Sequence, residues 1–287
     1  DGNVEINEEG ITLLKNNNGA LPLTSGAKIS VFGKNSVNLV LGGSGSSGGN
    51  ATSGAATISS SLTDAGFTVN PTLQAFYEST ASGSGRPSNP SIENNSVNVP
   101  IETGETPQSS YTSAVKDSYS SYKDAALVVF SRIGGEGFDL PRVASDDSTH
   151  HYLQLDNNET DLLKSVCNAG FGHVIVLINS NSAMELGFLD DPDNYAYNEK
   201  IDACLWSGGY GNQGAKAIGK ILSGEVNPSG HLPDTYYRNF KDDPTYKNFG
   251  NNNIENGDRY IVDGKAKQYY FVQYEEGIYV GYRYYET

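Results

Sequence analysis

The sequence predicts an α/β fold: a doubly wound, mostly parallel sheet with helices on both faces. Short apolar runs alternate with segments of helical periodicity, the pattern of strands joined by covering helices. The runs KISVFG (28–33) and AALVVFSR (125–132) are almost continuously apolar, as in strands buried on both faces. With 37% hydrophobic residues, a chain of 287 residues can also bury a sizeable core.

The expected elements follow this alternation along the chain. The expected strands are 28–33, 67–70, 125–132, 173–180 and 201–208. The expected helices are 55–66, 72–80, a stretch near 111–122, 157–170, a short one at 184–189, and 212–224. We expect Asn158 or a neighbour to cap the 157–170 helix, with Glu159 and Asp161 in its first turn.

We expect a single domain over residues 1–287, with its core at about 1–237. Residues 82–110 contain four prolines and no core-forming periodicity, which predicts a loop excursion. Residues 238–287 are polar and rich in tyrosine, which predicts an irregular C-terminal extension.

Charge and composition argue against several classes of partner. The chain carries 19 basic and 34 acidic residues, a net charge of −15, so we expect neither nucleic-acid nor membrane binding. No apolar run approaches the roughly 18–20 residues of a membrane helix. Cys167 and Cys204 stand in apolar surroundings, which predicts core residues. We expect no metal, because His150 and His151 have no evident third ligand.

Two short motifs carry weaker signals. Gly43, Gly45 and Gly48 formally match the dinucleotide fingerprint, but they lie well beyond the strand and no acidic residue follows a second strand, so no nucleotide cofactor is expected. Acceptor sequences for N-glycosylation at Asn50, Asn94 and Asn158 favour a secreted or extracellular protein, with a cytoplasmic one left open.

The string SRIGGEGFD (131–139) is the most informative one for chemistry. Ligands of parallel sheets bind beyond the carboxyl ends of the strands, and Glu136 follows such a strand between glycines. A general acid needs this placement, with its pKa raised by partial burial and a second carboxylate. The alternative is a tight surface turn whose glutamate is only solvated. An ion pair of Asp139 with Arg132 or Arg142 would support the loop.

Several strings, in order, resemble the α/β-sandwich domain of glycoside hydrolase family 3, the β-glucosidase family. The resemblance covers nearly the whole chain, with 82–110 and 238–268 as the freer parts. It rests on ITLLKNNNGALPL, KISVFGKN, GGSGSSGG, VVFSRIGGEGFD, HVIVLINSNSAMEL, DACLWSGGYGNQGAKAIGKILSGEVNPSGHLPDTYY and YEEGIYVGYRYYET. The blocks GEVNPSGHLPDT and EEGIYVGYRYY are its most specific parts.

The resemblance implies an active site shared by two domains. A barrel of (β/α)₈ type carries an aspartate nucleophile, and the sandwich supplies the acid/base. Glu136 matches the glutamate of the family's GEG-[FY]-D stretch and is the implied catalytic residue. Ser46, or else Ser44, matches a serine that contacts the sugar. Arg132 is placed beside the site, to bind substrate or order its loop, and Asp139 supports that loop.

The chain departs from the family pattern in lacking the barrel and its S-D-[WY] nucleophile stretch. Its two ends resemble the subgroup in which the sandwich precedes the barrel. We therefore expect the acid/base-bearing domain of a retaining β-glycosidase that hydrolyses terminal β-linked sugars and is inactive alone. Expected partners are a small oligosaccharide or glucoside, the barrel domain, and in addition a scaffold or dockerin-like module.

Two alternatives remain open at this stage. The chain could be a non-catalytic binding or assembly module, which docks a partner through an apolar, tyrosine-rich patch near its C-terminal third. A free-standing sugar-binding α/β protein is the third interpretation. Replacement of Glu136 by glutamine separates them, because catalysis needs the carboxylate and docking does not.

Overall fold

The computed structural model describes most of the chain. It covers residues 1–88, 90, 99–136, 140–141, 143, 148–246 and 274–287, and the backbone of four short strands at 92–93, 96–97, 257–262 and 265–270. Ser47 is described by its backbone alone.

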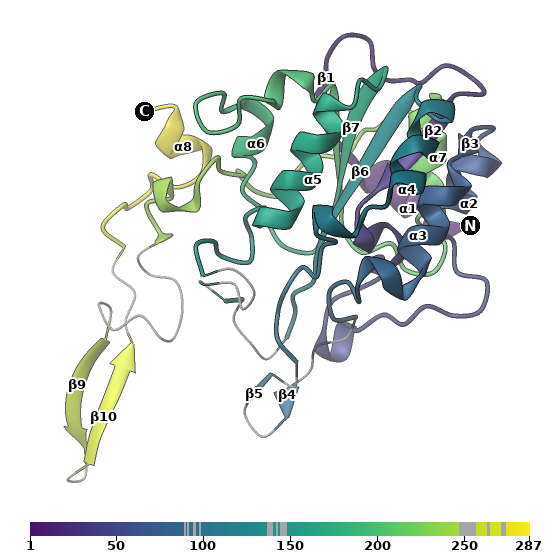
Figure 1. The fold of residues 1–287 in the computed structure, drawn as a ribbon. Helices are drawn as coiled ribbons and strands as arrows, with labels where there is room; N and C mark the ends of the chain where they lie inside the picture. The colour runs from purple at the N-terminus through teal and green to yellow at the C-terminus, as the bar shows by residue number, and fades with distance from the viewer. Residues whose placement is uncertain are drawn as a thin grey trace.

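A six-stranded sheet forms the centre of the molecule, in the order β1-β8-β7-β6-β2-β3 (Figure 1). Its strands are β1 (Thr12–Asn16), β2 (Lys28–Phe32), β3 (Thr68–Val69), β6 (Ala125–Arg132), β7 (His173–Ser180) and β8 (Ala203–Ser207). All neighbours are parallel except β1, which runs antiparallel to β8 at one edge.

The chain order of the five parallel strands creates a switch point. Counted along the chain, these strands stand side by side as 2-1-3-4-5. The connection leaving β2 passes to β3 on one side, whereas β6 and its successors lie on the other. The crevice at the carboxyl ends of β2 and β6 is therefore where a ligand is expected in an open parallel sheet.

Helices cover both faces of the sheet (Figure 1). One face packs α2 (Ile58–Asp64) and α7 (Lys216–Ser223) into a core that takes alternate strand residues such as Leu127. The opposite face takes Val128 and its counterparts against α3 (Pro71–Glu78), α4 (Ser113–Ser118), α5 (Asn157–Asn168) and α6 (Gly187–Asp190). Successive side chains of a strand point to opposite faces, which explains this division.

The predicted α/β class is confirmed, and the central strands β6 and β7 have the predicted bounds. Cys167 and Cys204 are buried free thiols in the core, as predicted. The cap of α5, expected at Asn158 or a neighbour, is Asp156, whose carboxylate accepts the Glu159 amide while the Glu159 carboxylate accepts the Asp156 amide. This reciprocal capping box satisfies two backbone amides at the start of the helix, where no carbonyl of a preceding turn is available.

The sequence did not indicate the two N-terminal elements, α1 (Gly2–Gly10) and β1. Only Val4 and Asn7 of α1 are buried, so the helix has almost no apolar periodicity. Strand β1 is defined by antiparallel pairing with β8, a contact between residues about 190 positions apart.

Segment 82–110, expected as a loop excursion, is anchored at both ends. It holds the short strands β4 (Ile92–Glu93) and β5 (Ser96–Val97), which pair with each other. On one side of them, buried Arg86 donates from Nε to the Ser131 hydroxyl at 2.9 Å. On the other, the buried Glu105 carboxylate accepts the Lys34 amide at 3.0 and 3.1 Å.

The C-terminal extension contains regular structure that the sequence analysis missed. Strands β9 (Gly257–Val262) and β10 (Lys265–Tyr270) form an antiparallel hairpin, and α8 (Tyr282–Tyr285) follows. The Asp-Gly pair at 263–264 of the sequence is a strong hairpin signal that could have predicted it.

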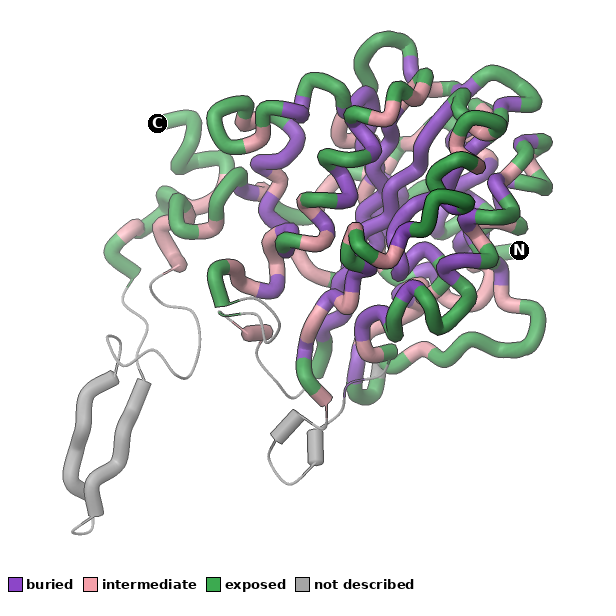
Figure 2. Tube along the Cα trace, in the orientation of Figure 1, coloured by how far each residue is buried: buried purple, intermediate pink, exposed green. Residues whose placement is uncertain are grey.

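The same extension exposes a C-terminal tyrosine patch, and Figure 2 shows this end of the chain largely exposed. The patch consists of Tyr274, Ile278, Tyr279, Tyr282, Tyr284 and Tyr285. The expected apolar, tyrosine-rich docking surface near the C-terminal third stays a prediction, and these side chains are its exposed candidates. Among the described residues, no helix has the length and apolar character needed to cross a membrane.

Candidate active site

Two loops meet at the switch point of the sheet. The loop after β2 contains the short 3-10 turn Gly45–Ser47, and the loop after β6 carries Glu136. The Ser44 amide donates to the Gly134 carbonyl at 3.1 Å, and Ser44 forms a β-bridge with Gly135. The fold thus brings together the two stretches in which the sequence placed the acid and the serines.

Glycine at position 135 allows this close approach. A Cβ there would lie 2.4 Å from the Ser44 hydroxyl oxygen and 2.5 Å from the Ser44 amide nitrogen. Gly45 has φ +70°, which favours glycine, and a Cβ there would lie 2.9 Å from the Cβ of Glu136. Any side chain at either position would push the two loops apart.

Glu136 is exposed, and Ser46 holds its carboxylate. Oε2 of Glu136 accepts the Ser46 amide at 3.1 Å and also accepts the Ser46 hydroxyl. The hydrogen bonds from the Ser46 side chain and amide lower the pKa of Glu136. The pKa rise that the sequence analysis expected from burial is therefore wrong for this chain, because the carboxylate is open to solvent.

The structure separates the two candidate serines. Ser46 is exposed and faces the carboxylate, whereas Ser44 is buried and joins the loops through its backbone. The geometry thus favours Ser46 over Ser44 for contact with a ligand.

Arg132 does not reach the surface of the site. Its side chain is 0% exposed, and it forms a two-pronged ion pair with Glu159, with N–O distances of 2.7 and 2.6 Å. It also donates to the carbonyls of Tyr152 and Gln154. Burial lowers the pKa of Arg132, but the charge and hydrogen bonds of Glu159 outweigh this and raise it above the usual value.

The expected contact of Arg132 with substrate is therefore wrong, because every side of the guanidinium is enclosed in the core. Arg132 is a positioning residue that ties the end of β6 to α5. The other members of the expected ion pair, Asp139 and Arg142, lie outside the described residues.

Asn179, at the end of β7, is a functional candidate that the sequence analysis missed. Its Oδ1 accepts the Val40 amide at 2.7 Å, and its Nδ2 donates to the carbonyls of Gly208 at 2.7 Å and Val40 at 3.3 Å. One buried amide side chain thus fixes the loop after β2 against the loop after β8. A lone asparagine ending the apolar run HVIVLINS was the available signal.

Arg86 is a second missed residue, and it connects the same loop to segment 82–110. Besides Ser131, it donates to the Asn38 carbonyl at 2.7 Å and the Pro87 carbonyl at 3.0 Å. Burial lowers the pKa of Arg86 to about 10.

Fold and site together define a doubly wound α/β domain with one exposed carboxylate, held by a serine, at its switch point. Glu136 could exchange a proton with a bound ligand, and the exposed hydroxyl of Ser46 could bind it. Within the described ranges, no group of three or more histidine, cysteine or acidic side chains could hold a metal ion.

Comparison with known proteins assigns the domain to a family. Residues 11–282 match the family model described as the glycosyl hydrolase family 3 C-terminal domain. The chain therefore belongs to this family, which confirms the resemblance found in the sequence.

Two similar curated proteins that match over nearly the whole chain are β-glucosidases. Beta-glucosidase A of Butyrivibrio fibrisolvens is 29% identical, over 97% of this chain and 31% of its own length. A beta-glucosidase of Ruminococcus albus is 30% identical, over 99% of this chain and 26% of its own length.

Solved structures give the same result. A beta-glucosidase from Paenibacillus barengoltzii matches with a TM-score of 0.74 and 28% identity, over 100% of this chain and 28% of its own. Beta-glucosidase 3B from Thermotoga neapolitana, in complex with α-D-glucose, matches with a TM-score of 0.72 and 29% identity, over 99% and 35%. The chain spans about a quarter to a third of the length of these relatives.

Proposed function

We propose that this chain is the acid/base-bearing domain of a retaining β-glycosidase that hydrolyses terminal β-linked sugars, with Glu136 as the acid/base. One observation carries the proposal: the Glu136 carboxylate is exposed at the switch point, on loops that pack too closely for any residue but glycine at position 135. The names of the relatives support a glucoside as substrate.

The proposed chemistry uses Glu136 twice. As an acid it protonates the glycosidic oxygen while a second carboxylate attacks the sugar, and as a base it then activates the water that releases the glycosyl-enzyme. These two carboxyl groups stand about 5–5.5 Å apart in retaining enzymes. We propose that the second one is an aspartate on a barrel domain outside this chain, a proposal that the greater length of the relatives supports.

The lowered pKa of Glu136 agrees with a site that needs another domain. A general acid works best with a pKa near the working pH, but here Ser46 lowers the pKa of an exposed carboxylate. A domain that covers Glu136 would exclude water, and its own carboxylate would add negative charge. Both effects raise a carboxyl pKa.

Ser46 is proposed to bind the sugar. Its exposed hydroxyl can donate to a sugar oxygen once substrate or the covering domain changes the environment of Glu136. Its amide would then retain Glu136 by the second hydrogen bond, at 3.1 Å.

The test compares leaving groups in the longer protein that carries both domains. Glu136→Ala should slow turnover most for substrates with poor leaving groups, because these need protonation, and azide should partly restore the rate. Glu199→Gln, at another exposed glutamate, should leave the rate unchanged. Equal losses for good and poor leaving groups would remove Glu136 from the acid role.

The 287-residue chain by itself provides a second test. We expect no turnover of aryl β-glucosides, because the proposed nucleophile lies elsewhere. Turnover by the homogeneous chain that disappears in Glu136→Gln would contradict this expectation.

The tyrosine patch supports a second candidate function, docking of a partner domain or scaffold. The patch places six large apolar side chains in solvent within residues 274–285. A docking role alone predicts that Glu136→Gln retains full function, so the same variant separates the two candidates. Secretion also remains a proposal, supported by the exposed acceptor Asn50.

A further inference from the structure

A cavity lies beside the candidate active site, at the carboxyl ends of β2 and β3. Its volume is about 300 Å³, at the lower end of the range for small-molecule sites. The wall is largely apolar and includes Val31, Leu39, Leu41, Ala55, Ile58 and Val69. A ligand here would contact two strands, the start of α2 and the loop after β2.

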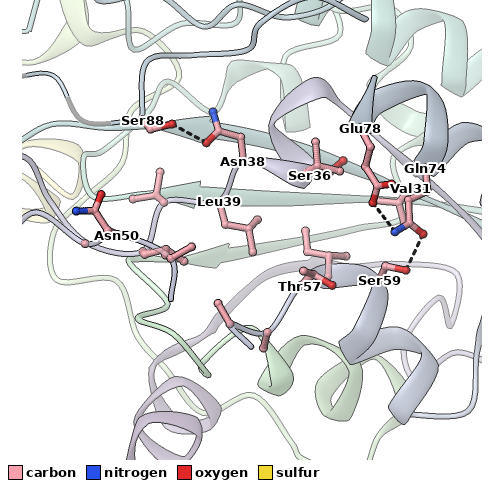
Figure 3. A pocket seen from close by; sticks show the side chains of 18 of the residues that line it. Val31, Ser36, Asn38, Leu39, Asn50, Thr57, Ser59, Gln74, Glu78 and Ser88 are labelled. Atoms are coloured by element: carbon pink, nitrogen blue, oxygen red, sulfur yellow. Dashed lines mark hydrogen bonds between the residues drawn. The ribbon is translucent and has the colours of Figure 1, made fainter. Parts of the chain in front are cut away.

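Polar groups stand on opposite sides of this apolar space (Figure 3). On one side, the Ser59 hydroxyl donates to Oε1 of Gln74 at 2.8 Å, and Nε2 of Gln74 donates to Oε1 of Glu78 at 2.9 Å. This row orders the Glu78 carboxylate at the wall and leaves its second oxygen to accept a further hydrogen bond. On the other side, Oδ1 of Asn38 accepts the Ser88 hydroxyl at 3.2 Å.

The chemical groups in the cavity wall indicate which kind of ligand the cavity can bind. A carboxylate accepts hydrogen bonds and repels anions, and the net charge of −15 adds to that repulsion. The remaining apolar space, within a volume of about 300 Å³, has room for an aromatic ring. We propose that the cavity binds a small, uncharged aromatic alcohol or phenol, which donates its hydroxyl hydrogen to Glu78.

The position of the cavity links it to Ser46. Leu41, Gly42, Gly49 and Asn50 line it, and they flank the turn Gly45–Ser47 on both sides. A bridge from Gly43 to Gly48 closes the base of that turn. A ligand against this base is expected to shift Ser46 and so change its hold on Glu136. Only the catalytic meaning of this coupling rests on the proposed function.

Benzyl alcohol and benzoate are matched probes, because they share a ring and differ in charge. Titration of the ¹⁵N-labelled chain with benzyl alcohol should give saturable amide shifts in residues 38–42, 49–59 and 69–78, and benzoate should bind at least roughly 10-fold more weakly. Equal binding of the two probes, or shifts spread evenly over the surface, would overturn the proposal.

Two variants test the location. Ala55→Phe fills the cavity and should abolish the saturable shifts, whereas Ala75→Phe, on the exposed side of α3, should retain them. Glu78→Gln keeps the shape of an exposed side chain, so folding is not at risk. The variant should bind benzyl alcohol roughly 5-fold more weakly than the wild type, and its preference for benzyl alcohol over benzoate should be smaller. Unchanged binding in Glu78→Gln would contradict the proposal.

The coupling has its own readout. Saturating benzyl alcohol should shift the Ser46 amide resonance and the titration midpoint of Glu136 in the wild-type chain, and should do neither in Ala55→Phe. Binding without a change at Ser46 would overturn the coupling and leave the role of Glu136 to the leaving-group test.

Discussion

Glu136 is held in its exposed position by short-range contacts between the loops that follow β2 and β6. Its loop can lie against the serine loop because Gly135 has no side chain, and Ser46 then reaches the carboxylate with both an amide and a hydroxyl. Glu136 and the serine that lowers its pKa thus follow different strands, but lie at the same edge of the sheet. The effect of Ser46 on the pKa of Glu136 can be tested without an activity assay.

Ser46→Ala should raise the pKa of Glu136 toward its ordinary value. The substitution removes the hydroxyl donor, which lowers that pKa most, and leaves the amide donor in place. A carboxyl-detected NMR titration of the chain would measure the change. Ser53→Ala, in an exposed turn of the same segment, is the control. An unchanged Glu136 midpoint in Ser46→Ala would show that the hydroxyl does not stabilise the ionised carboxylate.

The Arg132–Glu159 pair should behave as a buried unit. Arg132→Met leaves the Glu159 carboxylate buried without its partner and should cost about 3–5 kcal/mol of unfolding free energy. Arg132→Met combined with Glu159→Gln should recover much of the loss, because neither charge then remains buried and the glutamine oxygen can still accept the Asp156 amide. Urea unfolding measures both variants. A double variant as unstable as the single one would contradict the interpretation.

At this scale, a residue could be predicted when its signal was local. Glu136 combined a strand end with flanking glycines in one short string, and these features suffice to place it at the sheet edge. The environment of Arg132 could not be predicted from nearby residues. Its ion-pair partner Glu159 comes 27 positions later in the chain, on α5, and the carbonyls that accept its other hydrogen bonds belong to the loop before α5. Its burial arises from these distant contacts.

Helices and strands, like single residues, were predicted where the signal lies in neighbouring residues and missed where it depends on distant contacts. Strands β6 and β7 were predicted to the residue because they are buried on both faces and so read as continuous apolar runs. The anchors of segment 82–110 were not predicted, because they are single polar residues, Arg86 and Glu105, whose partners lie on other elements. Such hydrogen bonds leave no periodicity in a sequence.

Asn179 offers a test of how elements are held together at the switch point. Asn179→Asp keeps an acceptor for the Val40 amide but loses the donor to the Gly208 carbonyl, in a buried place. The substitution should lower the free energy of unfolding by at least about 1–3 kcal/mol, because it leaves the Gly208 carbonyl without its donor and also buries a charge. Urea unfolding measures the loss.

Asn157→Asp is the matched control for this substitution. Asn157 is exposed in the first turn of α5, where a negative charge is neutral or slightly stabilising. Similar losses in Asn157→Asp and Asn179→Asp would show that the buried amide makes no special contribution.

Glu105 should make stability depend on pH. Burial raises the pKa of this carboxyl from 4.5 to about 8, against the opposing hydrogen bond from Lys34. Between about pH 4.5 and pH 8, the folded chain therefore keeps a proton on Glu105 that the unfolded chain has already lost. Because the folded pKa is the higher one, stability should fall as the pH rises through this window, by about 2–4 kcal/mol.

Urea unfolding at about pH 5 and about pH 8 would measure this dependence in the wild type and in Glu105→Gln. The variant should show a flatter profile, because its amide does not titrate. Glu159, Asp156 and Lys34 face the same region and remain in both proteins, so the difference between the profiles isolates Glu105. Parallel profiles would contradict the raised pKa.

The whole molecule places its core and its exposed aromatic surface in different parts of the chain. Both hydrophobic clusters, one on each face of the sheet, consist of residues between Ile11 and Leu222. The strand order that creates the switch point was not predicted, since it depends on pairing between segments up to about 100 positions apart. Fold class, in contrast, followed from the alternation of elements alone.

The division between core and extension predicts the effect of a truncation. Deletion of residues 274–287 removes the Tyr285 ring, 5.6 Å from the Tyr237 ring, and touches neither cluster. The deletion also removes the hydrogen bond between the Gly281 backbone and the Tyr237 side chain, so the loss should be roughly 1–2 kcal/mol, the size of one aromatic contact and one hydrogen bond. Leu205→Ala, within the buried sheet, should cost about 2–5 kcal/mol in the same urea experiment. If the truncation destabilises the chain as much as Leu205→Ala, the extension is part of the cooperative core, and its exposed tyrosines cannot be treated as a separate docking surface.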